Sequence, residues 1–260
     1  MYNIAQILEP PPAPPLLPVP HTLLAMDTSG DVCSVACLRN GQLISEHTFR
    51  HGMHLSERLL EHVTAVLQDT SVLAQDVTAF AVGLGPGSFT GARIGVMTMK
   101  TFASLLDRPL YGVDSLAAIA RAYLGLNDVL IIPMHPCRAG IVYTGLYDAS
   151  TNQPAMILKP SALAISELVA EATKLSYSKL LFTGQALDKY RGDLQQALGS
   201  ALDRALWGST TFPRASDVGA IAWARITLGI PPDEPLSLAP QYVSPPPITM
   251  PKGIPMPPEA

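Results

Sequence analysis

Short apolar runs that predict β-strands come first along the chain. Leu23 to Met26 is a hydrophobic run that ends in a polar turn, and alternating segments follow at 32–38 and 42–49. Asn40 and Gly41 separate these two segments, and Asn-Gly is the strongest short-range signal of a β-hairpin. We therefore predict three strands that form an antiparallel meander.

The spacing of apolar residues then changes to that of helices. Hydrophobic residues recur three and four positions apart from Leu55 to Leu67, which predicts an amphipathic helix over about 55–68. A strand, a long helix, a second strand and a second helix are expected next, at 77–84, 90–106, 109–113 and 116–124.

The second half of the chain begins with the same kind of hairpin. Apolar runs predict strands at 129–134, 141–147, 155–158 and 180–183. Helices are expected at 161–174, 187–198 and 217–228, the last with Asp217 as its N-cap.

The two halves therefore repeat one order of elements, a strand hairpin followed by alternating helices and strands. That order is typical of an α/β protein with the two-lobed architecture of actin, Hsp70 and the sugar kinases, in which each lobe is a mixed sheet flanked by helices. We expect an N-terminal lobe at 22–113 and a C-terminal lobe at 114–229.

Proline is concentrated at the two ends of the chain. Residues 1–20 hold seven of the 25 prolines and residues 231–260 hold eleven. Proline lacks a backbone donor and fixes φ, so such runs favour extended chain. We expect a proline-rich tail at 1–21 and a proline-rich C-terminal segment and tail at 230–260, around a folded unit of about 22–243.

Composition narrows the class of function. The net charge is −4 and the isoelectric point about 5.8, which disfavours unaided binding of nucleic acid. No apolar stretch approaches the roughly 20 residues of a membrane span. The first basic residue is Arg39, which fits neither a secretory signal nor a transit peptide, and three cysteines without a C-x-x-C pair indicate a reduced, cytoplasmic protein.

The most information-rich segment is the glycine-rich stretch from Gly83 to Gly95, between a predicted strand and a predicted helix. Its glycines allow close backbone approach, and Ser88 or Thr90 is placed to cap the helix. A tight capped turn, a phosphate cradle and a loop that contacts a partner all fit. It is not a P-loop, because no Gly-Lys-[Ser/Thr] follows.

The turn Asp27-Thr28-Ser29 follows the first predicted strand. ATP-handling proteins of the two-lobed group usually read Asp-x-Gly-Thr there, and Ser29 replaces that glycine. A structural aspartate that caps the turn is one interpretation. The other is an anion or nucleotide site formed by Asp27, Thr28, Gly85, Gly87 and Ser88.

The helix expected at 90–106 is apolar on more than one side. Ile94, Val96, Met97, Met99, Phe102, Leu105 and Leu106 surround it, while Gly91, Ala92 and Gly95 allow another element to come close. A helix that is apolar nearly all round is either buried or covered by a partner. Both interpretations stay open from the sequence.

The sequence contains no complete catalytic motif among those considered. There is neither a Gly-x-Ser-x-Gly elbow nor a His-Glu-x-x-His pattern. Cys137 beside Arg138 has no evident base nearby, and His47, His51 and His54 lack the spacing of a zinc site. A capping or interface role of His54 with Glu57 fits better. We expect no metal and no cofactor.

Three strings in the chain together resemble a known family. They are Leu24-Ala25-Met26-Asp27-Thr28-Ser29, then His54-x-Ser56-Glu57-Arg58-Leu59-Leu60, then Gly85-Pro86-Gly87-Ser88-Phe89-Thr90-Gly91-x-Arg93-Ile94-Gly95. The chain resembles TsaB (also called YeaZ), the bacterial partner subunit in tRNA threonylcarbamoyladenosine synthesis. The resemblance spans about 22–243.

The resemblance implies a function as well as a fold. It implies a non-catalytic scaffold that pairs with the catalytic subunit TsaD, assisted by the ATPase TsaE, with tRNA reached only through the complex. The contact would use the first two helices of the N-terminal lobe. Its expected residues are His54, Leu55, Arg58, Leu59, His62, Gly91, Arg93, Ile94, Gly95 and Met99.

The sequence departs from the family at three places in its second half. Pro136-Cys137-Arg138 replaces Asp-Ala-Arg, Gln185-Ala186 replaces the end of Thr-Gly-x-Gly, and Ser244 replaces an arginine. These departures put nucleotide or tRNA contacts there in doubt. The alternative function is an ATP-dependent phosphotransferase or ATPase, and self-pairing of the lone chain stays open.

Overall fold

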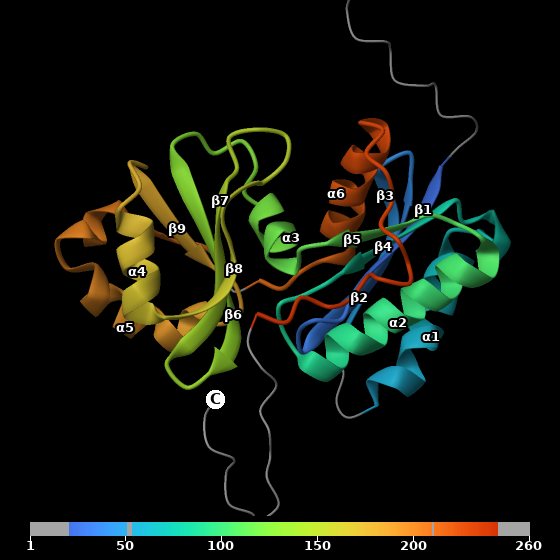
Figure 1. Ribbon diagram of the computed structural model, residues 1–260, viewed down its shortest axis with the longest axis horizontal. Coiled ribbons are helices and arrows are strands. Elements are labelled where there is room, and N and C mark those ends of the chain that lie inside the picture. The colour runs from blue at the N-terminus through green and yellow to red at the C-terminus, as the bar shows by residue number, and fades with distance from the viewer. Residues whose placement is uncertain (1–20, 51–53, 210, 244–260) are drawn as a thin grey trace, which may run out of the picture.

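The computed structural model describes residues 21–50, 54–209 and 211–243, which form two lobes side by side (Figure 1). The proline-rich tails lie outside the described residues, apart from His21 and the segment 230–243. In the described part of the chain, no helix has the length and apolar character needed to span a membrane.

The first lobe holds a five-stranded sheet in the order β3-β2-β1-β4-β5. β1, β2 and β3 are antiparallel neighbours, as the Asn40-Gly41 hairpin predicts, while β4 and β5 run parallel to β1. The bounds are β1 Thr22–Asp27, β2 Val32–Arg39, β3 Gln42–Arg50, α1 Leu55–Asp69, β4 Ala79–Gly83, α2 Phe89–Leu106, β5 Leu110–Val113 and α3 Ser115–Arg121.

The second lobe repeats that arrangement in the order β10-β9-β6-β7-β8. β6, β7 and β8 are antiparallel neighbours, and β9 and β10 run parallel to β6. The bounds are β6 Val129–Arg138, β7 Ile141–Asp148, β8 Ala155–Ala164, α4 Ile165–Thr173, β9 Lys179–Thr183, α5 Leu187–Leu198, β10 Ala205–Trp207 and α6 Ala215–Thr227. The duplicated topology is the predicted two-lobed actin-like fold.

Strand residues of the first sheet alternate between two cores. Leu24, Met26 and Phe80 pack against α1 and α2 on one face, whereas Ala25 and Ala81 pack against α3 and α6 on the other. The central strands β1 and β4 are therefore buried on both faces, which explains why they are continuous apolar runs in the sequence, whereas the edge strand β3 is largely exposed.

Helix α3 lies between the two lobes (Figure 1). Its Ala118 belongs to the core of the first sheet, while Leu116 and Ile119 pack with Ile131 and Tyr147 of the second. The other face of the second sheet is covered by α4 and α5. One short helix thus supplies apolar contacts to both sheets and fixes the lobes against each other.

The helix expected at 161–174 begins later than the periodicity indicates. Residues 161–164 continue β8, because Ser161 pairs with Thr144 and Ala164 with Ile141 of β7. The helix starts at Ile165, and the Glu167 side chain accepts a 3.0 Å hydrogen bond from the Ala164 amide. Pairing with a neighbouring strand therefore overrode the local helical pattern.

Helix α6 differs from its prediction in both its start and its neighbours. It begins at Ala215, and Asp217 lies inside the helix, where it accepts a 2.8 Å hydrogen bond from Arg121. The expected boundaries place this segment in the C-terminal lobe, but its buried face packs on the first sheet. The chain thus returns to the N-terminal lobe after β10.

The segment 230–243 crosses the first lobe as a strap along β5. The Asp233 amide donates to the Leu110 carbonyl, and its carboxylate accepts from the Gly112 amide and Arg225. Lys100 Nζ donates to the carbonyl oxygens of Leu236 and Leu238 at 3.2 and 3.0 Å. The strap covers the open edge of the sheet, which would otherwise offer unpaired backbone groups.

Helix α2 comes very close to the end of β1 at two glycines. A Cβ at Gly91 would overlap the carbonyl oxygen of Thr28, and a Cβ at Gly95 would overlap Thr28 Oγ1. Thr28 Oγ1 also donates a 2.8 Å hydrogen bond to the Gly91 carbonyl. The small residues of this helix therefore serve packing within the lobe.

Gly95 and Gly192 are a matched pair for testing that packing. Both lie inside helices, where alanine is favoured over glycine by roughly 1 kcal/mol. A Cβ at Gly192 would meet nothing within 4 Å. We expect Gly192→Ala to raise the free energy of unfolding in urea by up to ~1 kcal/mol and Gly95→Ala to lower it by about 1–3 kcal/mol. Equal effects would contradict the packing role of Gly95.

Candidate functional site

Asp27 ends β1 and is completely buried. Its Oδ1 accepts hydrogen bonds from the amide and the hydroxyl of Ser29 at 2.8 and 2.7 Å, and its Oδ2 accepts from Ser115 Oγ at 2.6 Å. Burial raises the pKa of this carboxyl above its ordinary value. Asp27 therefore ties the turn after β1 to the start of α3 and does not face a ligand.

The glycine-rich loop between β4 and α2 is packed directly on that turn. A Cβ at Gly83 would overlap the Asp27 carboxylate, and a Cβ at Gly87 would overlap the Ser29 carbonyl. Ser88 caps α2, since its Oγ accepts a 3.1 Å hydrogen bond from the Gly91 amide. The tight capped turn that the sequence offered as one interpretation is the geometry observed.

Three amides of the loop and the first turn of α2 have partners inside the lobe. The Ser88 amide donates to the Ser29 carbonyl at 2.6 Å, the Gly85 amide to Ser115 Oγ at 3.0 Å and the Gly91 amide to Ser88 Oγ. A phosphate cradle needs such amides to be free for the ligand. Of the candidate anion site of Asp27, Thr28, Gly85, Gly87 and Ser88, the Asp27 carboxylate and the Gly85 and Ser88 amides are therefore used within the lobe.

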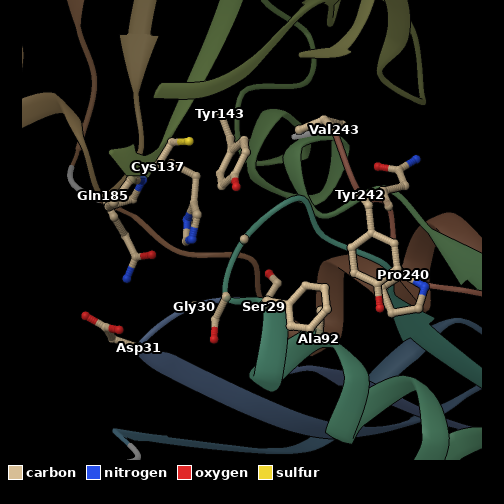
Figure 2. A pocket seen from close by; sticks show the side chains of 16 residues that line it. Ser29, Gly30, Asp31, Ala92, Cys137, Tyr143, Gln185, Pro240, Tyr242 and Val243 are labelled. Carbon is tan, nitrogen blue, oxygen red and sulfur yellow. The ribbon is translucent and has the colours of Figure 1, made fainter. Parts of the chain in front are cut away.

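A cavity of about 290 Å³ lies above this loop, between the lobes (Figure 2). The β1–β2 turn and the start of α2 form its floor, and β6, β7 and the residue Gln185 after β9 form the opposite wall. The strap closes it from the side with residues 240–243. In Figure 2, Asp31 and Gln185 lie at one side of the hollow and Tyr242 at the other.

His135 of β6 is a buried polar side chain of this cavity, with 5% of its surface exposed. Its Nδ1 has no hydrogen-bond partner within the described residues, and Gln241 Oε1 of the strap has none either. Burial lowers the pKa of His135 to about 4, so the imidazole is neutral near pH 7. Unpaired buried polar atoms are rare in native proteins.

Sequence reasoning missed His135, Gln185 and Gln241 as a group. They come from β6, from the residues after β9 and from the strap, more than 50 positions apart at the extremes. No spacing rule links them, because only the folding of the two lobes and the strap brings them together. Cys137 lines the same cavity, yet it is not hydrogen-bonded to His135 Nδ1.

Asp114 and Tyr147 connect the lobes beside this cavity. Asp114 caps α3 by accepting a 2.9 Å hydrogen bond from the Leu116 amide, and the Tyr147 hydroxyl of β7 donates a short hydrogen bond to its other oxygen. Burial raises the pKa of Asp114 to about 6. A carboxyl that titrates near neutral pH thus sits at the joint between the lobes.

The second candidate region is the outer surface of α1 and α2, which lie together on one face of the first sheet (Figure 1). Five of the expected contact residues point into the lobe and are buried there: Leu55, Leu59, Gly91, Gly95 and Met99. His54, Arg58 and Arg93 are exposed, and His62 and Ile94 are half-buried. The inward residues shape the helices, so a partner would touch the others.

Among the exposed residues of α2, Arg93 is the one charged side chain, and the others are apolar or uncharged. We call Thr90, Ile94, Met97, Thr101 and Leu105 the outer face of α2. Met97 is 58% exposed and Leu105 77%. The helix has two cationic side chains, and both have partners. Lys100 donates a hydrogen bond to the strap, and the Arg93 guanidinium lies 4.6 Å from the centre of the Phe89 ring.

The histidines near α1 act as structural side chains. His47 Nε2 lies 2.7 Å from Asp69 Oδ2, and the His62 ring stacks on Phe49 at 3.7 Å between centres. His54 Nδ1 lies 3.3 Å from the Glu57 carboxylate but does not cap the helix. His51 lies outside the described residues. Among the described residues, no three His, Cys, Asp or Glu side chains are grouped to hold a metal.

Comparison with known proteins agrees with this geometry. Residues 50–212 match the family model of TsaD, tRNA N6-adenosine threonylcarbamoyltransferase. The chain is 33% identical over 179 residues to the tRNA threonylcarbamoyladenosine biosynthesis protein TsaB of Bacillus subtilis, which covers 69% of this chain and 77% of the relative. The chain belongs to the TsaB (YeaZ) family.

Two further members of the TsaB family match the chain over different lengths. The Escherichia coli TsaB protein is 30% identical over 145 residues, which is 53% of this chain and 62% of the relative. The solved structure of YeaZ from Pseudomonas aeruginosa superposes with a TM-score of 0.69 at 25% identity, over 85% of this chain and 99% of that one. The two-lobed fold is therefore that of the TsaB family.

Two departures of this chain from the TsaB pattern, Pro136 and Cys137, line the cavity. A third, Ala186 in place of the last glycine of Thr-Gly-x-Gly, directly follows the lining residue Gln185. Ser244 lies outside the described residues. The departures are thus remote from the outer face of α2 and concern the space between the lobes.

The joint between the lobes predicts a pH-dependent stability. The pKa of Asp114 in the folded protein is about 6, against an ordinary value of 3.8. The protonated carboxyl therefore contributes to the stability of the folded state, fully below about pH 4, and this contribution is lost as pH rises through 6. Asp114→Asn removes this term. We measure the free energy of unfolding of the variant and the wild type at pH 4.5 and at pH 7.5. We expect the difference, variant minus wild type, to be about 1–3 kcal/mol larger at pH 7.5. A difference that stays constant with pH would contradict the assignment.

Proposed function

We propose that this chain is a non-catalytic scaffold subunit of tRNA threonylcarbamoyladenosine synthesis, which pairs with a TsaD-like catalytic protein in the cytoplasm. The observation that carries the proposal is the uncharged outer face of α2 on a member of the TsaB family. The match to the TsaD family model supports pairing of two proteins with related folds.

The outer face of α2 has the composition of an interface centre. Met97 and Leu105 expose large apolar side chains, and threonines at 90 and 101 separate them without adding charge. Interface centres are depleted in charged residues, whereas the rim is polar. Leu60, exposed on α1, extends the apolar surface, and Arg58 and His54 lie on the exposed side of α1, where they suit a rim.

We propose two roles for the ten expected contact residues, according to whether their side chains are exposed or buried. Arg93, Ile94, His62, Arg58 and His54 offer surface to the partner. The other five, Leu55, Leu59, Gly91, Gly95 and Met99, hold α1 and α2 on the sheet. The partner would then bind a rigid pair of helices, which keeps the entropic cost of association low.

Further members of the complex follow from charge and from the resemblance. A net charge of −4 disfavours direct tRNA binding, so we propose that tRNA is reached only through the complex. A TsaE-like ATPase is the expected third component. Because the lone chain exposes the same apolar helix face, two copies would pair through it in the absence of the partner.

The alternative, an ATP-dependent phosphotransferase or ATPase, meets a physical obstacle in the closed glycine loop. We expect the purified chain to hydrolyse ATP no faster than a buffer control, because the Asp27 carboxylate and the Gly85 and Ser88 amides already have partners within the lobe. Phosphate release over a range of ATP concentrations measures this. Saturable turnover that is lost in Asp27→Asn would favour the enzyme instead.

Met97→Glu tests the pairing directly. Burying an unpaired carboxylate in an apolar contact is costly, so we expect affinity for a TsaD-like protein to fall at least about tenfold. Light scattering after size exclusion, alone and in mixture, gives the association state, and a titration gives the affinity.

Leu228→Glu is the matched control for that experiment. Leu228 is 73% exposed and follows α6, which packs on the opposite face of the first sheet. The same charge placed there should leave pairing unchanged. If Met97→Glu retains wild-type affinity, or if both variants lose it equally, the outer face of α2 is not the interface.

A further inference from the structure

We propose that the cavity between the lobes is a binding site for a small molecule that carries a primary ammonium group. The site is independent of the helix face to which the partner subunit is assigned, because it lies between β6, the β1–β2 turn and the strap. The inference rests on unpaired acceptors, on the charge of the walls and on the size of the space.

The unpaired buried atoms of the cavity lining are both hydrogen-bond acceptors. Gln241 Oε1 is a carbonyl oxygen, and it has no partner among the described residues. His135 uses one ring nitrogen in a hydrogen bond with the Ser29 backbone, which leaves Nδ1 without a proton on the neutral ring. A ligand that satisfies both atoms must therefore bring N–H or O–H donors.

The charge of the cavity lining favours one kind of hydrogen-bond donor in the ligand, a cationic one. Of the residues that line the cavity, Asp31 is the one carboxylate, and no lysine or arginine is present. The Asp31 charge reaches His135, whose pKa it raises against the larger effect of burial. An ammonium group supplies three donors and a positive charge, so it complements both the acceptors and Asp31.

Aromatic rings complete the cation-binding character. Tyr143 and Tyr242 line the cavity from β7 and the strap (Figure 2). Aromatic faces attract ammonium groups through their quadrupole. The rings also give room for a short apolar chain attached to the amine.

The size and the floor of the cavity argue against a nucleotide. A space of about 290 Å³ is at the lower limit of ligand pockets, which run from roughly 300 to 1,000 Å³. Two amides of the glycine loop, those of Ser88 and Gly85, are already bonded to Ser29 and Ser115, and no lysine or arginine lines the cavity to meet a phosphate. The acceptable ligand is thus a metabolite-sized amine rather than a phosphorylated compound.

Cys137 provides a native reporter of occupancy. It lines the cavity and is partly exposed, whereas Cys33 and Cys37 are buried. The rate at which a disulfide reagent modifies Cys137 in the full chain should fall at least about fivefold at saturating n-butylamine. The isosteric probes 1-butanol and butyrate, and inorganic phosphate, should leave that rate unchanged. Calorimetric titration with n-butylamine gives an affinity that does not depend on the thiol.

Asp31→Asn and Asp76→Asn form the matched pair of variants. Both aspartates are exposed, so neither change should disturb folding, but Asp76 lies before β4 while the cavity lies beyond its other end. Loss of the charge at 31 should weaken n-butylamine binding about tenfold, as expected for a charge-assisted contact. The variant at 76 should bind like the wild type.

Several results would overturn the ammonium site. They are protection by 1-butanol equal to that by n-butylamine, protection by butyrate or phosphate, absence of binding by n-butylamine, and an undiminished affinity in Asp31→Asn. Met97→Glu should keep the amine affinity of the wild type while it loses the partner. The two proposals therefore fail or succeed separately.

Discussion

The close contact of the glycine loop and α2 with the turn Asp27–Ser29 is the constraint on which the rest of the structure depends. Backbone and side-chain atoms of the turn occupy the space that a Cβ would need at Gly83, Gly87, Gly91 and Gly95. Only glycine permits this distance between a helix and a strand end. The same contact uses the loop amides, so a motif that resembles a phosphate site stabilises the lobe instead.

The position of α2 follows from that contact and decides which side of the helix is exposed. Because Gly91 and Gly95 lie against Thr28, Met99 and Val96 are directed into the core and Met97 and Leu105 outward. An all-round apolar sequence thus becomes a two-sided helix, with one side packed on its own sheet and the other exposed and largely uncharged. The buried interpretation of the sequence describes the first side, and cover by a partner stays a proposal for the second.

The order of elements could be predicted from sequence because it depends on local periodicity. The Asn40-Gly41 hairpin, the helix at 55–69 and the strand before Gly83 all follow from patterns within about 15 residues. The prediction was wrong for residues 161–164, because their strand conformation depends on pairing with β7. β10, of three residues, carries no pattern at all.

The residues of the candidate sites were predictable only where one element carries them. The α2 motif is continuous, so its importance was visible, but the inward direction of Leu59 and Met99 required the packed lobe. His135 and Gln241 line one cavity from a strand of the second lobe and from the strap, and no sequence window contains both. A distance set by tertiary folding cannot be inferred from spacing along the chain.

Duplication of the fold makes the difference between the two lobes informative. β1 and β6 hold the same place in their sheets, and the end of each approaches the space between the lobes. The end of β1 is closed by glycines packed on Asp27, whose carboxylate has all its partners. The end of β6 leaves His135 Nδ1 buried and unpaired beside an open volume. An unsatisfied buried polar atom costs about 1–3 kcal/mol, so His135 Nδ1 needs a donor from the cavity, which the proposed ammonium ligand would supply.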